Sequence, residues 1–564
     1  MRRATRTLVG SAALVFTGLA LQSTSATVAA TAGAAATYIV LAHDTAAIAD
    51  ATRAVAAAGG RVVRTNDKIA LLTVTSRRVD FATVLAGAKG VDGIAHNAPI
   101  GHNRTPSTGG LKSVTNANVD NATGATATAP APAPAPADSA APADSAAPAA
   151  TNAVAAEPLA AQQWDMAQIH ATPTGSYAVN RGDRRVTVGM LDSGLDWNHP
   201  DISANLDRAK SRNFRSFDPA IDASCVEACT ATLGVDPAGH GTAMASLVAA
   251  PLNGFGIGGV APNVSLVDLR VGQPGGFILI DPVVNALTYA ADAGIDVANM
   301  SFSIDPWFYN CVANPADSPA EQAEQRAIIL AFTRAAIYAR ARNVTLVAPA
   351  GNENTNIDAP GIDVFSPDLP NRTAHDRAIT PGTCFYLPAM APGVVTVSGT
   401  ESTTAKGDIS NYGRSIDIAA PSASRTTGTP PIVQAISREG AINNGWLDPA
   451  TGDITGPISK ECVGTRCAYY AFIGGTSDST AEVSGVAALV ISRYGTPVPG
   501  RGLELSAASV ERRLYATAHP HACPATDPVY VGFPPVFPSS AHCAPTANGN
   551  SFYGHGIVDA LAGR

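Results

Sequence analysis

The chain has 564 residues, of which 46% are hydrophobic and 15% are charged. This length exceeds that of one ordinary domain, so we expect two or more folded units and connecting segments. The net charge of -8, with no cluster of Lys and Arg beyond the N-terminus, argues against nucleic acid as the main partner, because phosphate binding requires a concentrated basic surface.

The first 30 residues have the pattern of an export signal. Arg2, Arg3 and Arg6 precede an uncharged apolar run over 8–21, and small residues follow it. A membrane anchor is the alternative, but the run is shorter than the roughly 20 apolar residues that span a bilayer. We therefore predict a signal peptide over 1–30, a secreted protein, and no membrane contact after the signal is removed.

A small α+β unit is predicted over 36–102. Its pattern indicates two helices and three strands, ending in a turn: strands at 38–42, 61–65 and 69–75, and helices at 45–58 and 81–88. Over 103–158 the composition changes, and the middle of this stretch consists of Ala/Pro and Ala-Asp-Ser-Ala-Ala-Pro repeats. Such a segment buries too little side chain to offset the entropy of ordering, so it is predicted to be a flexible linker.

The remaining residues, 159–564, alternate short apolar strands with helices. Strands are predicted at 186–191, 265–271, 297–302, 345–349 and 394–398, and helices at 282–293, 321–342 and 476–493. Fully apolar strands between helices are typical of a parallel sheet covered on both faces. We therefore predict a doubly wound, mainly parallel α/β fold, in which functional groups gather at the carboxyl ends of the strands.

All eight cysteines lie in this last unit. An even number in an exported chain indicates disulfides, although the count alone leaves many connectivities open. Zinc is the alternative, but the paired C-x2-C knuckles usual for structural zinc are absent. Our prediction is that sequence neighbours pair: Cys225 with Cys229, Cys311 with Cys384, Cys462 with Cys467, and Cys523 with Cys543.

Three polar residues stand where a strand ends or a helix begins. Asp192 ends an apolar strand, His240 starts an apolar helix between two glycines, and Ser477 starts another helix after Gly474-Gly475-Thr476. Taken singly, each has an ordinary structural explanation, such as a turn residue or a helix N-cap. Together they supply the nucleophile, the base and the orienting carboxylate that amide hydrolysis by serine needs, in one of the known chain orders.

These motifs resemble those of the subtilisin-like serine proteases (subtilases, peptidase family S8). The stretch 192–201 resembles the family's aspartate motif, 240–242 its histidine motif, and 475–477 followed by 483–490 its serine motif. The resemblance extends over most of the chain beyond the linker. It implies a serine endopeptidase that acts on extended polypeptides, with Asp192, His240 and Ser477 as its catalytic triad.

Further stretches resemble the family's substrate-binding parts. The stretch 348–352 is similar to the loop whose asparagine completes the oxyanion hole, and 299–303 to an edge strand that pairs with bound peptide. The resemblance therefore implies an oxyanion role for Asn352, although an asparagine after glycine can also cap a helix. It further implies substrate contacts at Ser301, Phe302, Ser303, Ala350 and Gly351.

The unit at 36–102 resembles the family's inhibitory propeptide, which implies a self-processing zymogen that binds its own propeptide. The long linker leaves the cleavage point open. We expect a monomer.

Three departures from the family pattern surround the nucleophile. Subtilases typically carry Met after the serine and Pro four residues after it, where this chain has Asp478 and Ala481, and Glu482 replaces a residue that is usually His. Asp478 suits the helix dipole, but its charge lies close to the site of oxyanion formation. Two alternatives stay open. A maturation protease of narrow specificity would share every motif, whereas a catalytically dead scaffold that acts as a binding protein is favoured by Asp478 alone.

No cofactor is needed for this chemistry, and calcium is left open as a structural ion. Asp201 matches a position that ligates calcium in some relatives, but an aspartate after proline is often a turn residue. The loop 252–259 contains no carboxylate, whereas calcium sites are usually rich in them. We therefore predict no specific metal site.

Overall fold

The computed structural model describes residues 35–97, 157–215, 219–222, 224–367, 374–424, 427–500, 502–530 and 539–564. The predicted signal over 1–30 and all but the last two residues of the predicted linker lie outside these ranges. Within them, no helix combines the length and the apolar character that crossing a membrane would require.

The N-terminal unit is a four-stranded antiparallel sheet with strand order β2-β3-β1-β4, covered on one face by two helices. The final segment, predicted as a turn, is instead strand β4, which pairs with β1. Gly93 obscures this strand in the sequence, because glycine weakens a strand pattern; here a Cβ on Gly93 would lie 3.0 Å from Ala327 of a neighbouring helix. The elements are β1 (Ala36–Ala42), α1 (Ile48–Ala57), β2 (Gly60–Asn66), β3 (Leu71–Ser76), α2 (Phe81–Leu85) and β4 (Val91–His96).

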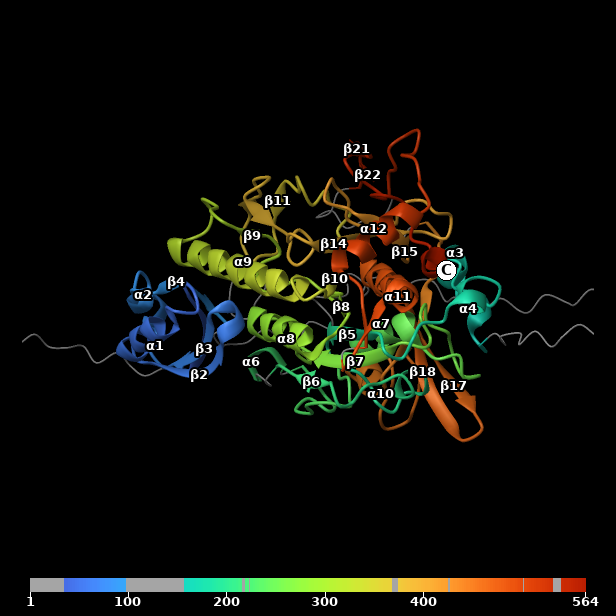
Figure 1. The fold of residues 1–564 in the computed structure, drawn as a ribbon, viewed down its shortest axis with the longest axis horizontal. Coiled ribbons are helices and arrows are strands. Elements are labelled where there is room, and N and C mark those ends of the chain that lie inside the picture. The colour runs from blue at the N-terminus through green and yellow to red at the C-terminus, as the bar shows by residue number, and fades with distance from the viewer. Residues whose placement is uncertain are drawn as a thin grey trace, which may run out of the picture.

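The other face of this small sheet packs on helices α8 (Ile280–Ala293) and α9 (Pro319–Arg340), and Figure 1 shows the blue unit beside them. Successive side chains of β1 point to opposite faces of the sheet. Ile39 and Leu41 enter the core shared with α8 and α9, whereas Tyr38 and Val40 pack under α1 and α2. This is the period of two expected of a strand with both faces buried.

Polar contacts complete the interface of the N-terminal unit with α8. Thr73 Oγ1 donates to Asp281 Oδ1 at 2.7 Å, and Arg64 forms an ion pair with the same carboxylate. Asn66 Nδ2 donates to Thr288 Oγ1 at 2.8 Å and to Asn285 Oδ1 at 3.1 Å. The interface thus contains a hydrophobic centre and, beside it, hydrogen bonds between side chains of the two units.

The large unit is built on a seven-stranded sheet with order β15-β14-β10-β8-β5-β7-β6, and all its strand pairs are parallel. This confirms the predicted α/β class. The strands are β5 (Thr187–Asp192), β6 (Arg212–Asn213), β7 (Ser265–Arg270), β8 (Val297–Asn299), β10 (Thr345–Pro349), β14 (Val394–Thr400) and β15 (Ile418–Pro421).

Helices cover both faces of this sheet. Alternate strand residues such as Leu191 and Leu346 pack on α8 and α9, whereas Met190 and Val347 pack on α7 (His240–Ala249) and α11 (Thr476–Tyr494). Figure 1 shows α7 and α11 close together at the centre of the molecule. The first turns of both helices lie near carboxyl ends of the sheet strands, since His240 contacts Asp192 of β5 and Ser477 contacts Ser301, which follows β8. A doubly wound sheet places functional groups at this position.

Shorter elements and hairpins complete the large unit. The further helices are α3 (Trp164–Gln168), α4 (Ser176–Val179), α5 (Pro200–Ser203), α6 (Pro219–Asp222), α10 (Arg438–Asn443) and α12 (Ala507–Thr517), with 3-10 turns at Asp67–Ile69, Ala160–Gln162 and Ala560–Gly563. The further strands are β9 (Asn310–Cys311), β11 (Ile362–Asp363), β12 (Arg377–Ala378), β13 (Cys384–Phe385), β16 (Ile432–Ile436), β17 (Ile458–Val463), β18 (Arg466–Ile473), β19 (Thr496–Val498), β20 (Gly502–Glu504), β21 (Pro545–Thr546) and β22 (Gly549–Asn550).

All four disulfides form between the cysteines predicted to pair: Cys225–Cys229, Cys311–Cys384, Cys462–Cys467 and Cys523–Cys543. The longest closed loop, between Cys311 and Cys384, joins strands β9 and β13. Each of the other three bridges closes a loop of 20 residues or fewer.

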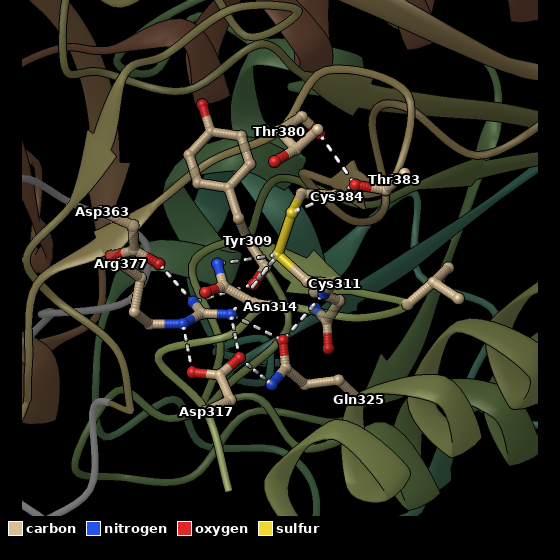
Figure 2. Close-up of a disulfide and its surroundings, with 12 residues drawn as sticks. Tyr309, Cys311, Asn314, Asp317, Gln325, Asp363, Arg377, Thr380, Thr383 and Cys384 are labelled. Carbon is tan, nitrogen blue, oxygen red and sulfur yellow. Dashed lines mark hydrogen bonds and ion pairs between the residues drawn. A yellow bond between two sulfur atoms is a disulfide. The ribbon is translucent and has the colours of Figure 1, made fainter. Parts of the chain in front are cut away.

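Beside the Cys311–Cys384 bridge, the wholly buried guanidinium of Arg377 connects several segments (Figure 2). Its Nε and Nη2 donate to the two oxygens of Asp317 at 2.8 and 3.0 Å, and Nη1 donates to Asp363 at 2.7 Å. Nη2 also donates to Gln325 of α9 at 2.7 Å. Burial alone would raise the pKa of Asp317, but the hydrogen bonds and charge of Arg377 outweigh it and hold the pKa below its usual value.

Replacing Arg377 is expected to destabilise the fold strongly, because two buried carboxylates lose their common partner. We predict that Arg377→Met lowers the free energy of unfolding by about 3–5 kcal/mol, and that Arg377→Lys does not restore it, since an ammonium cannot match the two-pronged geometry. Chemical denaturation measures this effect. The matched control is Arg438→Met, which removes an exposed ion pair with Glu227 of the kind worth about 1 kcal/mol or less; equal losses in the two variants would contradict the prediction.

Candidate active site

Strand β5 places Asp192 at its carboxyl end, in the interior of the sheet. The residue is only 1% exposed. Its Oδ1 accepts a hydrogen bond from the backbone N–H of Ser193 at 2.7 Å, and the Ser193 hydroxyl donates to Asp236 at 2.8 Å. The carboxylate is thus held by the turn that follows its own strand.

His240 is the first residue of α7, and its Nδ1 lies 2.8 and 3.0 Å from the two oxygens of Asp192. Two glycines permit this approach: Gly239 has a left-handed φ of +83°, and a Cβ on Gly241 would lie 2.1 Å from the carbonyl oxygen of Gly194. The other ring nitrogen, Nε2, is buried and makes no hydrogen bond to the described residues.

The charge of His240 reflects its surroundings. Burial favours the neutral ring, but the carboxylate of Asp192, with further contributions from Asp478 and Asp236, outweighs burial and raises the pKa of His240 above its ordinary value. An imidazole oriented in this way is suited to accept a proton at Nε2 and to remain stable as an imidazolium.

Ser477 is the second residue of α11, the helix that packs against α7. Its hydroxyl donates to the carbonyl oxygen of Ser301 at 3.4 Å, and the Ser301 hydroxyl donates back to the carbonyl oxygen of Ser477 at 3.1 Å. Asn299 bridges Ser301 and Ser484 of α11 with hydrogen bonds of 3.0 Å. The start of α11 is therefore fixed against the chain that leaves β8.

Asn352 lies in the loop after β10 and is hydrogen-bonded to the start of α11. Its Oδ1 accepts from the backbone N–H of Thr476 at 2.9 Å and from the Thr476 hydroxyl at 3.0 Å. Oδ1 is thus bound to Thr476, the residue before Ser477, and is not available to a substrate, so Nδ2 is the group of this amide that could donate to an oxyanion. An amide donor beside a nucleophile is the arrangement that an oxyanion hole requires.

Comparison with known proteins agrees with this geometry. Residues 183–556 match the profile of the subtilase family, Peptidase_S8. The chain belongs to the subtilase family. It is 28% identical over 347 residues to the nisin leader peptide-processing serine protease NisP of Lactococcus lactis subsp. lactis, covering 60% of this chain and 45% of that protein. It is 25% identical to subtilisin DY of Bacillus licheniformis, covering 59% of this chain and 83% of that protein.

Solved structures show the same fold. The epidermin leader peptide processing serine protease EpiP of Staphylococcus aureus superposes with a TM-score of 0.56 at 19% identity, covering 94% of this chain and 97% of that one. Fervidolysin of Fervidobacterium pennivorans gives a TM-score of 0.51 at 18% identity, covering 94% of this chain and 60% of that one. The match to NisP spans less than half of that enzyme's length.

The segment predicted to bind substrate at an edge strand is not a strand in this subtilase. The predicted strand 297–302 ends early, since β8 stops at Asn299 and lies inside the sheet. The N–H of Phe302 instead bonds to the carbonyl oxygen of Met300 at 2.8 Å, which turns the chain out of the sheet. The Phe302 side chain is 1% exposed and packs in the core. Substrate contact by this residue stays a prediction.

The other residues predicted to contact substrate differ in burial. Ser301, Ala350 and Gly351 are buried, and Ser303 is half-buried. Gly351 has a φ of +103°, and a Cβ there would lie 2.4 Å from Asn411 Nδ2. Substrate binding by these residues stays a prediction.

A group of buried carboxyls surrounds the start of α11. The imidazole of His240 favours the ionised form of Asp478, but burial outweighs it. Asp478 Oδ2 accepts from the N–H of Gly475 at 2.8 Å, and burial raises the pKa of Asp478 to about 7. Glu482, one turn later, has both carboxyl oxygens buried without a hydrogen bond to the described residues, and burial raises its pKa well above the usual value. Burial likewise raises the pKa of Asp165 on α3 to about 7.

Sequence reasoning found Asp478 and Glu482 but missed Asp165, because nothing in the local sequence of α3 indicates that it faces α11. All three carboxyls are buried, and burial shifts each of them towards its neutral form.

The surroundings of Asp201 offer part of a calcium site. Its Oδ2 accepts from the Tyr470 hydroxyl at 2.6 Å and from the N–H of Ile257 at 3.1 Å. Its Oδ1 and Glu157 Oε2 are buried and lack hydrogen bonds to the described residues, and burial, with the charge of Glu157, raises the pKa of Asp201 to about 7. Two such oxygens fit an ion that prefers oxygen ligands. Glu157 escaped sequence reasoning because it falls in the predicted linker.

Asp478 is expected to shift the pH dependence of activity through His240. Because its carboxylate raises the pKa of His240, Asp478→Asn should move the acid limb of the kcat/KM profile to lower pH. Asp453→Asn, at an exposed position between α10 and β17, serves as the control and should leave the limb in place. An unshifted limb in Asp478→Asn would contradict the electrostatic coupling.

Glu482 is expected to make stability fall as pH rises. Its folded-state pKa is raised, so above the unfolded-state pKa of about 4.3 the unfolded chain releases a proton that the folded chain retains. Glu482→Gln should therefore gain stability relative to wild type between pH 5 and pH 8, by up to about 1.4 kcal/mol per pH unit. Urea denaturation at both pH values measures this, and a constant difference would refute it.

Proposed function

We propose that this subtilase is a secreted serine endopeptidase that cleaves extended polypeptides through an acyl-enzyme on Ser477. The observation that carries the proposal is the buried contact between His240 Nδ1 and both oxygens of Asp192, which turns Nε2 away from the carboxylate. Its membership of the subtilase family supports the same activity. Extracellular proteases among its relatives and four disulfides support secretion.

In the first half of the reaction, Ser477 Oγ attacks the peptide carbonyl carbon while Nε2 of His240 accepts the hydroxyl proton. Asp192 holds the ring in the required tautomer and stabilises the imidazolium. The imidazolium then donates its proton to the leaving amine as the C–N bond breaks. In the second half, water attacks the ester carbonyl and loses a proton to Nε2. The imidazolium then returns this proton to Ser477 Oγ as the ester C–O bond breaks and the acid leaves.

The tetrahedral intermediates carry a negative oxygen that needs donors. Asn352 Nδ2 and the backbone N–H of Ser477 would supply them, since Thr476 already holds the Asn352 oxygen. No cofactor takes part in these steps. Asp201 and Glu157 would hold a calcium ion that stabilises the adjoining loop without entering the chemistry.

The N-terminal unit is proposed to be the inhibitory propeptide of a self-processing zymogen. Its sheet packs on α8 and α9 through a shared hydrophobic core and the contacts of Arg64, Thr73 and Asn66. We propose that the enzyme binds its own propeptide and is otherwise a monomer.

A narrow maturation specificity is the second candidate. It is favoured by the similarity to NisP and EpiP, both named for the processing of leader peptides. A peptide-library profile distinguishes the two candidates, because a maturation enzyme would cleave few sequences and a general protease many.

Removing the nucleophile tests the proposal. Wild-type protein should lose its N-terminal unit and bind one fluorophosphonate on Ser477, whereas Ser477→Ala should stay full length and unlabelled, as intact-mass spectrometry would show. If wild type also stays intact and unlabelled under the same conditions, the chain is a dead scaffold and the catalytic proposal fails.

Asn352→Ala should lower kcat by about 100- to 1,000-fold, the usual effect of removing one oxyanion donor. KM should change little, because the donor acts on charge that develops in the transition state. Steady-state kinetics with a peptide substrate measure both constants. A change confined to KM would assign Asn352 to ground-state binding instead.

A further inference from the structure

Two histidines and an aspartate from distant parts of the sequence meet at one point of the large unit. His170 follows α3, His519 follows α12, and Asp559 precedes the last 3-10 turn. His170 Nδ1 lies 3.1 Å from Asp559 Oδ1, and His519 Nε2 lies 2.9 Å from Asp559 Oδ2. The three ligand-type atoms all lie within 4.8 Å of one another.

The backbone holds the three segments together independently of these side chains. The N–H of Ala560 donates to the carbonyl oxygen of Ile169 at 2.9 Å, which places Asp559 beside His170. His519 and Ile557 exchange two backbone hydrogen bonds, of 2.7 and 2.9 Å. The side chains are therefore brought together by the fold and do not depend on their mutual contacts.

Close backbone packing further fixes both histidines. A Cβ on Gly175 would lie 2.1 Å from the carbonyl oxygen of His170, and one on Gly556 would lie 2.2 Å from that of His519. His170 itself has a left-handed φ of +61°, which is uncommon for a residue with a Cβ. The backbone that carries each imidazole therefore has little freedom to move.

The geometry points to a site for a zinc-class divalent cation, which we propose is bound by His170 Nδ1, His519 Nε2 and the carboxylate of Asp559. Ligand atoms about 2.0–2.1 Å from a tetrahedral zinc ion lie roughly 3.3 Å apart, close to the two separations found here. Imidazole nitrogen and carboxylate oxygen are both ligands that zinc accepts.

The surroundings also suit a metal with one solvent ligand. The side chains of His170 and His519 are 47% and 55% exposed, so water can reach the fourth position, whereas the Asp559 side chain is 10% exposed. The N–H of Leu561 donates to Asp559 Oδ1 at 2.9 Å and so orients the carboxylate. The bound ion would join the beginning of the large unit to its end.

Zinc binding to the folded state alone would stabilise the protein by mass action. Chelator-treated, tag-free full-length Ser477→Ala protein, which should not digest itself, should bind one Zn²⁺ per chain by calorimetry. Its Tm should rise by about 3 °C at a free zinc concentration 100-fold above Kd. Co²⁺ should occupy the same site and give the visible absorption of a tetrahedral complex.

The variants His170→Ala, His519→Ala and Asp559→Asn should each lose the cobalt spectrum and the zinc-dependent rise in Tm. The control is His542→Ala, which removes an exposed histidine paired with one aspartate, Asp527, at the same 2.9 Å; it should bind zinc as the parent does. The absence of stoichiometric zinc binding in the parent protein would overturn the proposal. Binding that survives in His519→Ala would also overturn it, since the metal would then lie elsewhere.

Discussion

Burial of the Asp192–His240 pair is the constraint on which the rest of the site depends. The two residues are 1% and 3% exposed, so water contributes little to the stability of either charge. The carboxylate instead relies on the ring nitrogen and on the N–H of Ser193. To bring α7 this close to β5, the chain needs glycine at 239 and 241, where a side chain would strike Ile436 or the Gly194 carbonyl. Helix α11 then packs beside α7 and places Ser477 in the same region.

Buried charge is treated in two opposite ways in this molecule. Around Arg377, the carboxylates of Asp317 and Asp363 share one guanidinium, which also bonds to Gln325 of α9. Around the start of α11, burial raises the pKa of Asp478, Glu482 and Asp165, so their ionisation costs stability, and the charge of His240 only partly offsets this cost at Asp478. Unfavourable electrostatics beside a nucleophile are consistent with the general trade of stability for function at active sites.

The features that could be predicted from the sequence are those with a local signal. The strands β5, β7, β10 and β14 were predictable because continuous apolar runs bounded by turns leave few alternatives. The four disulfides were predictable because three of the bridges close short loops, so each cysteine finds its sequence neighbour. Glycine-flanked polar residues at strand and helix ends identified Asp192, His240 and Ser477 as candidates.

The features that could not be predicted from the sequence depend on tertiary contacts. Strand β4 forms because β1 offers an unpaired edge, which its own glycine-containing sequence does not indicate. Phe302 enters the core because β8 ends at Asn299, a boundary set by neighbouring strands. Glu157 near Asp201, and His170 near His519, are brought together over long stretches of sequence. No periodicity or motif could reveal those pairs.

The most direct measurement is the rate at which a fluorophosphonate labels Ser477 in wild type and in Asp192→Asn, because it reports activation of the serine without substrate recognition. If the buried carboxylate holds His240 in its catalytic tautomer, labelling by Asp192→Asn should be slower by about 10,000-fold at neutral pH, the scale of the effect when a triad loses its aspartate. Equal rates in the two proteins would show that Ser477 is not activated through His240, and the proposed mechanism would be wrong.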